Sequence, residues 1–139
     1  MKVVILAGGQ GTRLSEVTTL LPKPMVKIGN IPILIHIINI FSKFGHSDYY
    51  IATGYKSQII KNFFKSKSKK FKIINKNHSL AEWTYKGEKI NINLINTGMN
   101  SMTGGRILKL KKYLNDENFL LTYGDGLANI NITKLIKFH

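Results

Sequence analysis

The chain has 139 residues, of which 43% are hydrophobic and 20% are charged. This length and balance are those of a single folded domain with its own core, and they exclude a collagen, a coiled coil and a disordered chain. The sequence contains no cysteine, which excludes a disulfide scaffold, a zinc ribbon, an iron–sulfur site and a thiol nucleophile. Any metal ion must therefore be held by oxygen or histidine ligands.

The charge is strongly basic, because 21 Lys and Arg residues stand against 7 Asp and Glu residues and give a net charge of +14. Such a charge favours an anionic partner: a nucleic acid, a membrane surface or a phosphorylated small molecule. All the basic residues except Arg13 and Arg106 are lysines, and they are scattered along a chain that is also rich in Ile and Asn. These three residue types have AT-rich codons, so genomic composition is the favoured explanation, and we do not expect nucleic acid as a partner.

The apolar segments are too short to span a membrane. The longest one, residues 31–41, is interrupted by Pro32, His36 and Asn39, whereas a span requires about 18 or more apolar residues. The apolar start of the chain leads directly into glycines without the spacing of a signal-peptide cleavage site. We therefore expect a cytoplasmic protein that does not associate with membranes.

The first half of the chain alternates between strand and helix patterns. Residues 3–7 form a continuous run of branched apolar residues before glycines, as in a strand buried on both faces of a parallel sheet. Polar residues three or four apart predict an amphipathic helix over 32–45, which Pro32 would begin and Gly45 would end. The next expected elements are a strand over 49–53 and a helix over 57–65.

The second half continues the alternation after an irregular stretch. A lysine-rich segment over 65–70 precedes alternating residues at 71–75 and 83–85, which indicate a small antiparallel excursion. The pattern then predicts strands over 90–95 and 119–123, a helix over 105–113 with Ile107, Leu108 and Leu110 facing inward, and a helix over 132–138. Strand–helix alternation predicts an α/β fold with a Rossmann-like, mostly parallel sheet flanked by helices. Ligands of such folds gather at the carboxyl ends of the strands.

Four loops follow the predicted strands, and the first is the most informative. Gly8, Gly9 and Gly11 fill three of four consecutive positions, which allows the backbone to approach a phosphate group and turn its N–H groups toward it. Thr12 adds a hydroxyl group and Arg13 a charged fork. The loop is neither a Walker A motif nor a Gly-x-Gly-x-x-Gly motif. The other three loops are 54–56, 96–106 and 124–126.

A second candidate phosphate ligand follows the glycine loop. Lys23 lies between Pro22 and Pro24, and the two prolines restrict the backbone on both sides of it. This restriction is typical of a positioned cation rather than of a mobile surface lysine. With Arg13 and Lys23 nearby, a mere strand-to-helix turn is a poor explanation of the glycines.

These motifs resemble the N-terminal signature of the sugar-1-phosphate nucleotidyltransferases. The resemblance is carried by Leu6-Ala7-Gly8-Gly9, Gly11-Thr12-Arg13-Leu14, Pro22-Lys23-Pro24-Met25 and Pro32-Ile33-Leu34. Within that family the chain is similar to the glucose-1-phosphate cytidylyltransferase branch through Ser15-Glu16, Thr18, Gly54-Tyr55-Lys56, Thr97-Gly98, Met102-Thr103-Gly104-Gly105-Arg106 and Tyr123-Gly124-Asp125-Gly126. The resemblance implies a nucleotidyltransferase fold of the GT-A-like type that is incomplete at its C-terminus.

The resemblance also implies a reaction, in which CTP and glucose 1-phosphate give CDP-glucose and pyrophosphate. A phosphate oxygen of the sugar attacks the α-phosphorus in line with the leaving pyrophosphate, so the protein must supply alignment and positive charge rather than a covalent nucleophile. Arg13 and Lys23 are the expected catalytic residues. The expected partners are CTP, or another nucleoside triphosphate, and a sugar 1-phosphate, and the full-length enzyme is expected to be a homo-oligomer.

The loop over 101–106 resembles the nucleotide-recognition loop of the family. Thr103 and the amides of Gly104 and Gly105 would contact the base or ribose, and Arg106 would lie near phosphate or support the loop. The alternative is a plain helix N-terminus with Thr103 as its N-cap and the glycines serving the turn. The full set of expected nucleotide-binding residues is Ala7, Gly8, Gly9, Gly11, Thr12, Arg13, Lys23, Thr103, Gly104, Gly105 and Arg106.

Asp125 is the expected metal ligand, for Mg²⁺. It follows a predicted strand and lies between two glycines, and Mg²⁺ takes one or two carboxylates together with phosphate oxygens of the substrate. The alternative is an aspartate that serves only the turn in Gly-Asp-Gly.

Chains of this family run well beyond 139 residues, so residues 1–139 are expected to form the N-terminal, nucleotide-binding part of a nucleotidyltransferase domain. A second metal-binding carboxylate, a second phosphate-binding lysine and most sugar contacts would then lie beyond His139. Three alternatives remain open: a truncated, catalytically inactive nucleotide-binding module, an enzyme for another nucleotide or sugar phosphate, and a basic nucleic-acid-binding protein.

Overall fold

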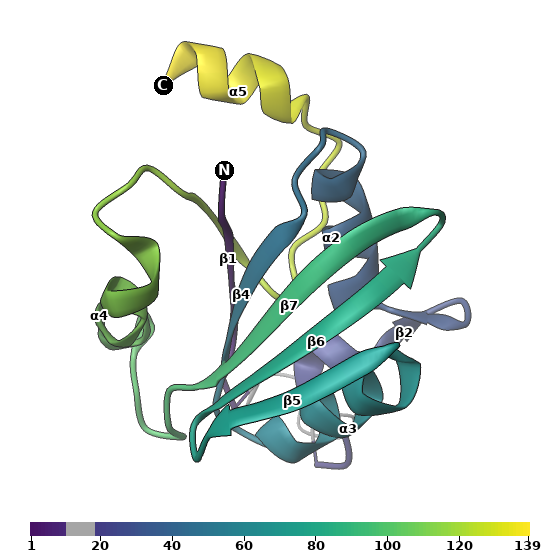
Figure 1. The fold of residues 1–139 in the computed structure, drawn as a ribbon, viewed down its shortest axis with the longest axis vertical. Coiled ribbons are helices and arrows are strands. Elements are labelled where there is room, and N and C mark those ends of the chain that lie inside the picture. Colours follow the sequence, from purple (N-terminus) through teal and green to yellow (C-terminus); the bar gives the residue numbers. More distant parts are fainter. Residues whose placement is uncertain (11–18) are drawn as a thin grey trace.

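A computed structural model describes residues 1–10 and 19–139, and a six-stranded sheet forms its centre (Figure 1). The strands are β1 (Val3–Ala7), β4 (Asp48–Thr53), β5 (Lys70–Asn75), β6 (His78–Tyr85), β7 (Glu88–Asn96) and β8 (Leu120–Tyr123). Their spatial order is β5-β6-β7-β4-β1-β8. The strands β7, β4, β1 and β8 are mutually parallel, whereas β5 and β6 are antiparallel to their neighbours. The expected mostly parallel α/β sheet is therefore confirmed.

Helices cover both faces of the sheet. They are α2 (Ile33–Ser42), α3 (Ser57–Lys67), α4 (Thr103–Leu114) and α5 (Ile132–Phe138). Buried residues of α2 and α3 share one hydrophobic cluster, whereas those of α4 belong to a second cluster on the opposite face. Two short elements precede α2: a 3₁₀ turn, η2 (Lys23–Met25), and a ribbon of β2 (Lys27–Ile28) with β3 (Ile31–Pro32).

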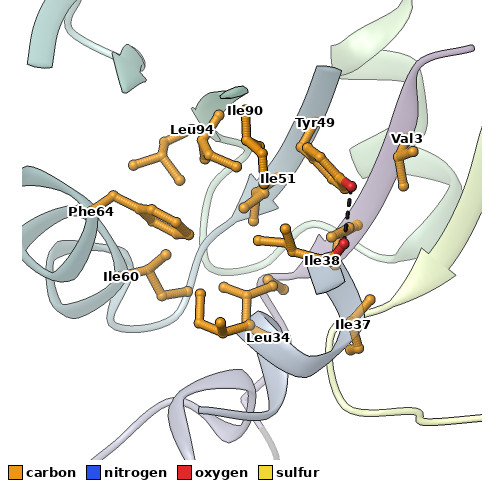
Figure 2. Close-up of a cluster of buried hydrophobic side chains, with 14 of the residues drawn as sticks. Val3, Leu34, Ile37, Ile38, Tyr49, Ile51, Ile60, Phe64, Ile90 and Leu94 are labelled. Atoms are coloured by element: carbon orange, nitrogen blue, oxygen red, sulfur yellow. Dashed lines mark hydrogen bonds between the residues drawn. The ribbon is translucent and has the colours of Figure 1, made fainter. Parts of the chain in front are cut away.

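Strand β1 is buried along its whole length because both of its faces are covered. Val3 and Ile5 belong to the cluster beneath α2 and α3, and Val4 and Leu6 belong to the cluster beneath α4. This division follows from the alternation of side chains along a strand. The larger cluster (Figure 2) includes Phe64 of α3, whose ring meets that of Trp83 edge-on at 5.8 Å between centroids.

The antiparallel arm β5-β6-β7 is more extensive than the excursion expected over 71–75 and 83–85. Strand β6 is eight residues long, and it pairs with β7 from His78 opposite Ile95 to Tyr85 opposite Glu88. The turn between them places Lys86 and Gly87 at φ values of 50° and 85°. Two consecutive residues with positive φ are typical of a two-residue hairpin turn.

Two predicted helices differ from the observed ones. The helix predicted over 32–45 ends at Ser42, and Gly45 lies in the following turn at φ 81°. The helix predicted over 105–113 begins at Thr103, and Leu108 is 71% exposed rather than facing inward. Leu110 and Leu114 are buried against the sheet, and Ile107 and Tyr113 pack partly buried on the same cluster. Leu108 therefore lies on the face of α4 that turns away from the sheet. Within the described residues, no helix is both long and apolar enough to cross a membrane.

Tyr49 ties α2 to the sheet from within the core. Its side chain is fully buried, and its single hydroxyl proton is shared between the carbonyl oxygens of Ile38 at 3.0 Å and His46 at 2.8 Å (Figure 2 shows the first contact). Burial raises the pKa of Tyr49 above its ordinary value of 10.0. The folded protein therefore retains a proton that the unfolded chain releases at alkaline pH.

We expect the free energy of unfolding to fall as the pH rises above about 10, because only the unfolded chain then gains by ionising this tyrosine. The Tyr49→Phe variant should lose about 1 kcal/mol of unfolding free energy at pH 7, because phenylalanine lacks the hydroxyl that bonds these buried carbonyl oxygens. The variant should also show a smaller loss of stability at alkaline pH. Urea denaturation between pH 7 and pH 11 measures both effects. An identical alkaline decline in the variant would assign it to other groups, such as Tyr50, whose pKa burial also raises.

Candidate functional site

The loops after the parallel strands converge at one edge of the sheet, as the topology predicts. The amide of Tyr55 donates to the carbonyl of Gly8 at 3.1 Å, and the amide of Thr97 donates to that of Thr53 at 2.8 Å. The amide of Gly124 donates to the carbonyl of Leu6 at 2.9 Å. Hydrogen bonds thus join the ends of four neighbouring strands, β7, β4, β1 and β8.

A cavity of about 580 Å³ opens at this edge, which is within the usual size range of small-molecule sites. Its lining combines backbone from the glycine loop, two charged residues from other loops and the start of α4. The lining residues are Leu6, Ala7, Gly8, Gly9, Lys23, Pro24, Ser101, Met102, Thr103, Arg106, Tyr123 and Asp125.

Arg106 is the central residue of the site, because its guanidinium group joins three loops. The residue is only 4% exposed. Its Nη2 donates to the carbonyl of Gly8 at 2.7 Å, and its Nη1 donates to the Thr97 hydroxyl at 2.6 Å and to the carbonyl of Gly98 at 2.8 Å. Longer bonds reach the carbonyls of Thr53 at 3.3 Å and Met99 at 3.4 Å. All five acceptors are neutral oxygens, and burial lowers the pKa of the guanidinium group.

Two glycines make room for this guanidinium group. A Cβ atom on Gly8 would lie 2.2 Å from Nη1 of Arg106, and one on Gly54 would lie 2.6 Å from the same atom. The Gly54 Cβ would also lie 2.6 Å from the carbonyl oxygen of Gly98. Side chains at either position would therefore displace Arg106 or separate the loops.

A second cation supports the loop that Arg106 holds. Lys109, one helical turn beyond Arg106, donates to the carbonyl of Thr97 at 2.7 Å and to the hydroxyl of Ser101 at 2.8 Å. The Ser101 hydroxyl donates to the carbonyl of Thr97 at 2.5 Å. Sequence reasoning did not single out Lys109 or Ser101. The available signal was the spacing, since residues three apart on a helix share a face.

Lys23 and Asp125 meet at the cavity wall. The Nζ atom of Lys23 lies 2.6 Å from Oδ2 of Asp125, and the two side chains are 34% and 31% exposed. Asp125 therefore offers a partly exposed carboxylate beside the cavity, which fits one ligand position of a Mg²⁺ site completed by substrate oxygens. Within the described residues no group of three His, Cys, Asp or Glu side chains is placed to hold a metal ion, so Asp125 would be a single protein ligand here.

The structure brings most of the expected site residues together. Ala7, Gly8, Gly9, Lys23, Thr103, Arg106 and Asp125 all line the cavity. Gly104 and Gly105, which lie between Thr103 and Arg106 in the first turn of α4, do not line it. The N-cap of that helix is Met102 rather than Thr103, and it makes no side-chain capping bond. The remaining expected residues, Gly11, Thr12 and Arg13, lie outside the described part of the chain.

Comparison with known proteins finds relatives that align with this chain over its whole length. The family described as "Nucleotidyl transferase" matches residues 2–139. The chain is 46% identical over 141 residues to a Bacillus subtilis protein described as "Probable glucose-1-phosphate cytidylyltransferase". It is 43% identical over 143 residues to the glucose-1-phosphate cytidylyltransferase of Salmonella typhimurium. Each alignment covers 100% of this chain and 56% of the relative, so the chain spans little more than half the length of these proteins.

A solved structure shows the same fold. HddC from Yersinia pseudotuberculosis, complexed with GMP-PN, superposes with a TM-score of 0.73 at 26% sequence identity. The match covers 99% of this chain and 53% of HddC. Sequence and structure agree over the same region, and the chain belongs to the nucleotidyl transferase family.

Proposed function

We propose that residues 1–139 form the nucleotide-binding part of a glucose-1-phosphate cytidylyltransferase, which transfers a cytidylyl group from CTP to glucose 1-phosphate and releases pyrophosphate. The observation that carries the proposal is the cavity that joins the glycine loop, Lys23 and the loop held by Arg106. Identities of 43% and 46% to proteins described as glucose-1-phosphate cytidylyltransferases support this choice of substrates.

The glycine loop would bind the triphosphate through its backbone. Gly8 and Gly9 line the cavity, and backbone N–H groups in glycine-rich loops are common phosphate ligands. The hydrogen bond from Arg106 to the carbonyl of Gly8 holds the start of the loop. A preorganised loop does not have to be ordered when the nucleotide binds, which increases affinity and alignment.

Lys23 would supply positive charge to the phosphates. Its ammonium group lies at the cavity wall and remains one-third exposed, so a phosphate oxygen can reach it. In-line attack by the sugar phosphate on the α-phosphorus places additional charge on the leaving pyrophosphate, and a nearby cation stabilises that charge. Arg13 keeps the same proposed role, because it follows directly on the glycine loop in the sequence.

Asp125 would hold Mg²⁺ against the triphosphate. Its carboxylate is accessible and lines the same cavity as the glycine loop. When bound, Mg²⁺ would neutralise part of the negative charge of the phosphates. Thr103 and Ser101 line the same cavity, and their hydroxyl groups would contact the base or ribose. A sugar 1-phosphate partner, a homo-oligomer and a cytoplasmic location are part of the same proposal.

The test uses purified protein that contains these residues, in its full natural length. It compares pyrophosphate release from CTP, UTP, GTP and dTTP, each with glucose 1-phosphate and MgCl₂. We expect release with CTP at a kcat/KM at least about tenfold above that of the other nucleotides, as one or two lost base contacts imply. Binding of CTP without release would instead support a catalytically inactive nucleotide-binding module, and the absence of any triphosphate binding would overturn both readings.

A further inference from the structure

Lys23 and Asp125 carry opposite charges and stand in direct contact, although the proposed function gives them different ligands. Lys23 Nζ lies 2.6 Å from Asp125 Oδ2, inside the cavity wall. A lysine that donates to a carboxylate has less charge to offer a phosphate. A carboxylate beside the cavity also repels a triphosphate unless a cation neutralises it.

The backbone builds this contact. Gly124 packs so closely on the proline-flanked turn that a Cβ atom there would lie 2.9 Å from Cγ of Pro24 and 3.1 Å from the carbonyl oxygen of Leu6. The turn is closed by a hydrogen bond from the amide of Met25 to the carbonyl of Pro22 at 2.8 Å. Both side chains therefore start from fixed neighbouring backbone, and their meeting is not a chance contact of two mobile surface groups.

No other described cation takes the place of Lys23 at this carboxylate. The other cation that lines the cavity, Arg106, is buried and directs its hydrogen bonds to neutral oxygens of Gly8, Thr53, Thr97, Gly98 and Met99. The two remaining ion pairs of the described residues, Lys2–Glu117 and Lys70–Glu82, involve none of the cavity residues. The charge on Asp125 and the availability of Lys23 are therefore linked to each other.

We propose that the Lys23–Asp125 ion pair makes the site selective for a triphosphate that arrives with its divalent cation, over the same triphosphate without one. The proposal rests on the proposed function, because it assumes that the cavity binds a triphosphate. Without a cation, Asp125 holds Lys23 and repels the ligand. With a divalent cation beside Asp125, the carboxylate is neutralised and Lys23 is released to the phosphates.

This arrangement predicts positive coupling between cation and triphosphate, and the coupling must be reciprocal. It also predicts an unusual sign for one substitution. Asp125→Asn removes the competing carboxylate, so the variant should bind metal-free triphosphate more tightly than the wild-type protein does. A residue that served only as a turn former would give no change, and one that served only as a metal ligand would change binding solely when metal is present.

The experiment is calorimetric titration of the full-length protein with CTP and with inorganic tripolyphosphate, each in EDTA and in MgCl₂. We expect Asp125→Asn to bind both ligands about fivefold more tightly in EDTA, at the lower end of usual coupling between sites. We expect the gain in affinity on adding MgCl₂ to be largely lost in the same variant. Equal behaviour of tripolyphosphate and CTP would place the effect at the phosphates rather than at the base.

Two further variants control the result. Glu82→Gln makes the same change in charge and removes the Lys70–Glu82 pair, whose atoms lie 3.7 Å apart outside the cavity, and it should leave both affinities unchanged. In a Lys23→Gln background, Asp125→Asn should tighten metal-free binding less than it does in the wild-type background, because no lysine is left to release. Melting curves confirm that each variant is folded.

Unchanged or weaker metal-free binding by Asp125→Asn would overturn the inference while leaving the proposed function standing, provided the wild-type protein binds CTP with MgCl₂. A matching increase in Glu82→Gln would also overturn it, because general charge would then explain the effect. Failure of the wild-type protein to bind any triphosphate would overturn the inference together with the proposed function.

Discussion

Truncation of Arg106 to alanine should lower the free energy of unfolding by about 3 kcal/mol, because a buried guanidinium group and its hydrogen bonds are lost together. The variant would leave the carbonyls of Gly8 and Gly98, which now accept bonds of 2.7 and 2.8 Å, without this partner. Urea denaturation at pH 7 measures the change. Arg106→Lys should recover only part of it, since one ammonium group cannot reproduce a fork that contacts three loops.

Lys111→Ala is the matched control for this experiment. Lys111 lies on the same helix and is exposed, and surface substitutions usually change stability by less than about 0.5 kcal/mol. If Arg106→Ala cost no more than Lys111→Ala, Arg106 would not hold the loops together, and its short contacts would carry little energy.

Replacement of Lys23 by alanine should weaken the binding of CTP with MgCl₂ by about 1.5 to 3 kcal/mol, the usual scale of a charged hydrogen bond. This corresponds to roughly a tenfold to hundredfold rise in Kd. Stability should change little, because the ion pair that is lost is one-third exposed on both sides and such pairs contribute about 1 kcal/mol or less. Calorimetric titration measures the binding.

Lys27→Ala provides the comparison for this substitution. Lys27 is exposed in β2, four residues beyond Lys23, and it does not line the cavity, so its removal tests the effect of a nearby positive charge alone. We expect its effect on CTP affinity to be small and to disappear as salt is raised. Equal effects of the two substitutions would contradict a specific role for Lys23.

Local patterns in the sequence were sufficient for much of the fold. Val3–Ala7 is buried on both faces, as a continuous branched apolar run predicts. The four loops that were expected at the carboxyl ends of the strands do meet at one edge. These features depend on side-chain periodicity and on the direction of parallel strands, which short segments already encode. Of the seven expected site residues that line the cavity, six lie in these loops or directly beside them, and the seventh, Lys23, lies in η2.

Only the tertiary structure decided how the site is held together. A glycine-rich loop predicts that another group packs closely against its backbone. In the structure that group is the guanidinium of Arg106, 98 residues beyond Gly8. The ion pair between Lys23 and Asp125 joins residues that are similarly remote in sequence. The sequence predicts that Leu108 faces inward because its side chain is apolar. The orientation of α4 on the sheet instead leaves it 71% exposed. Contacts between distant segments depend on how helices and strands pack together, and no local pattern carries that information.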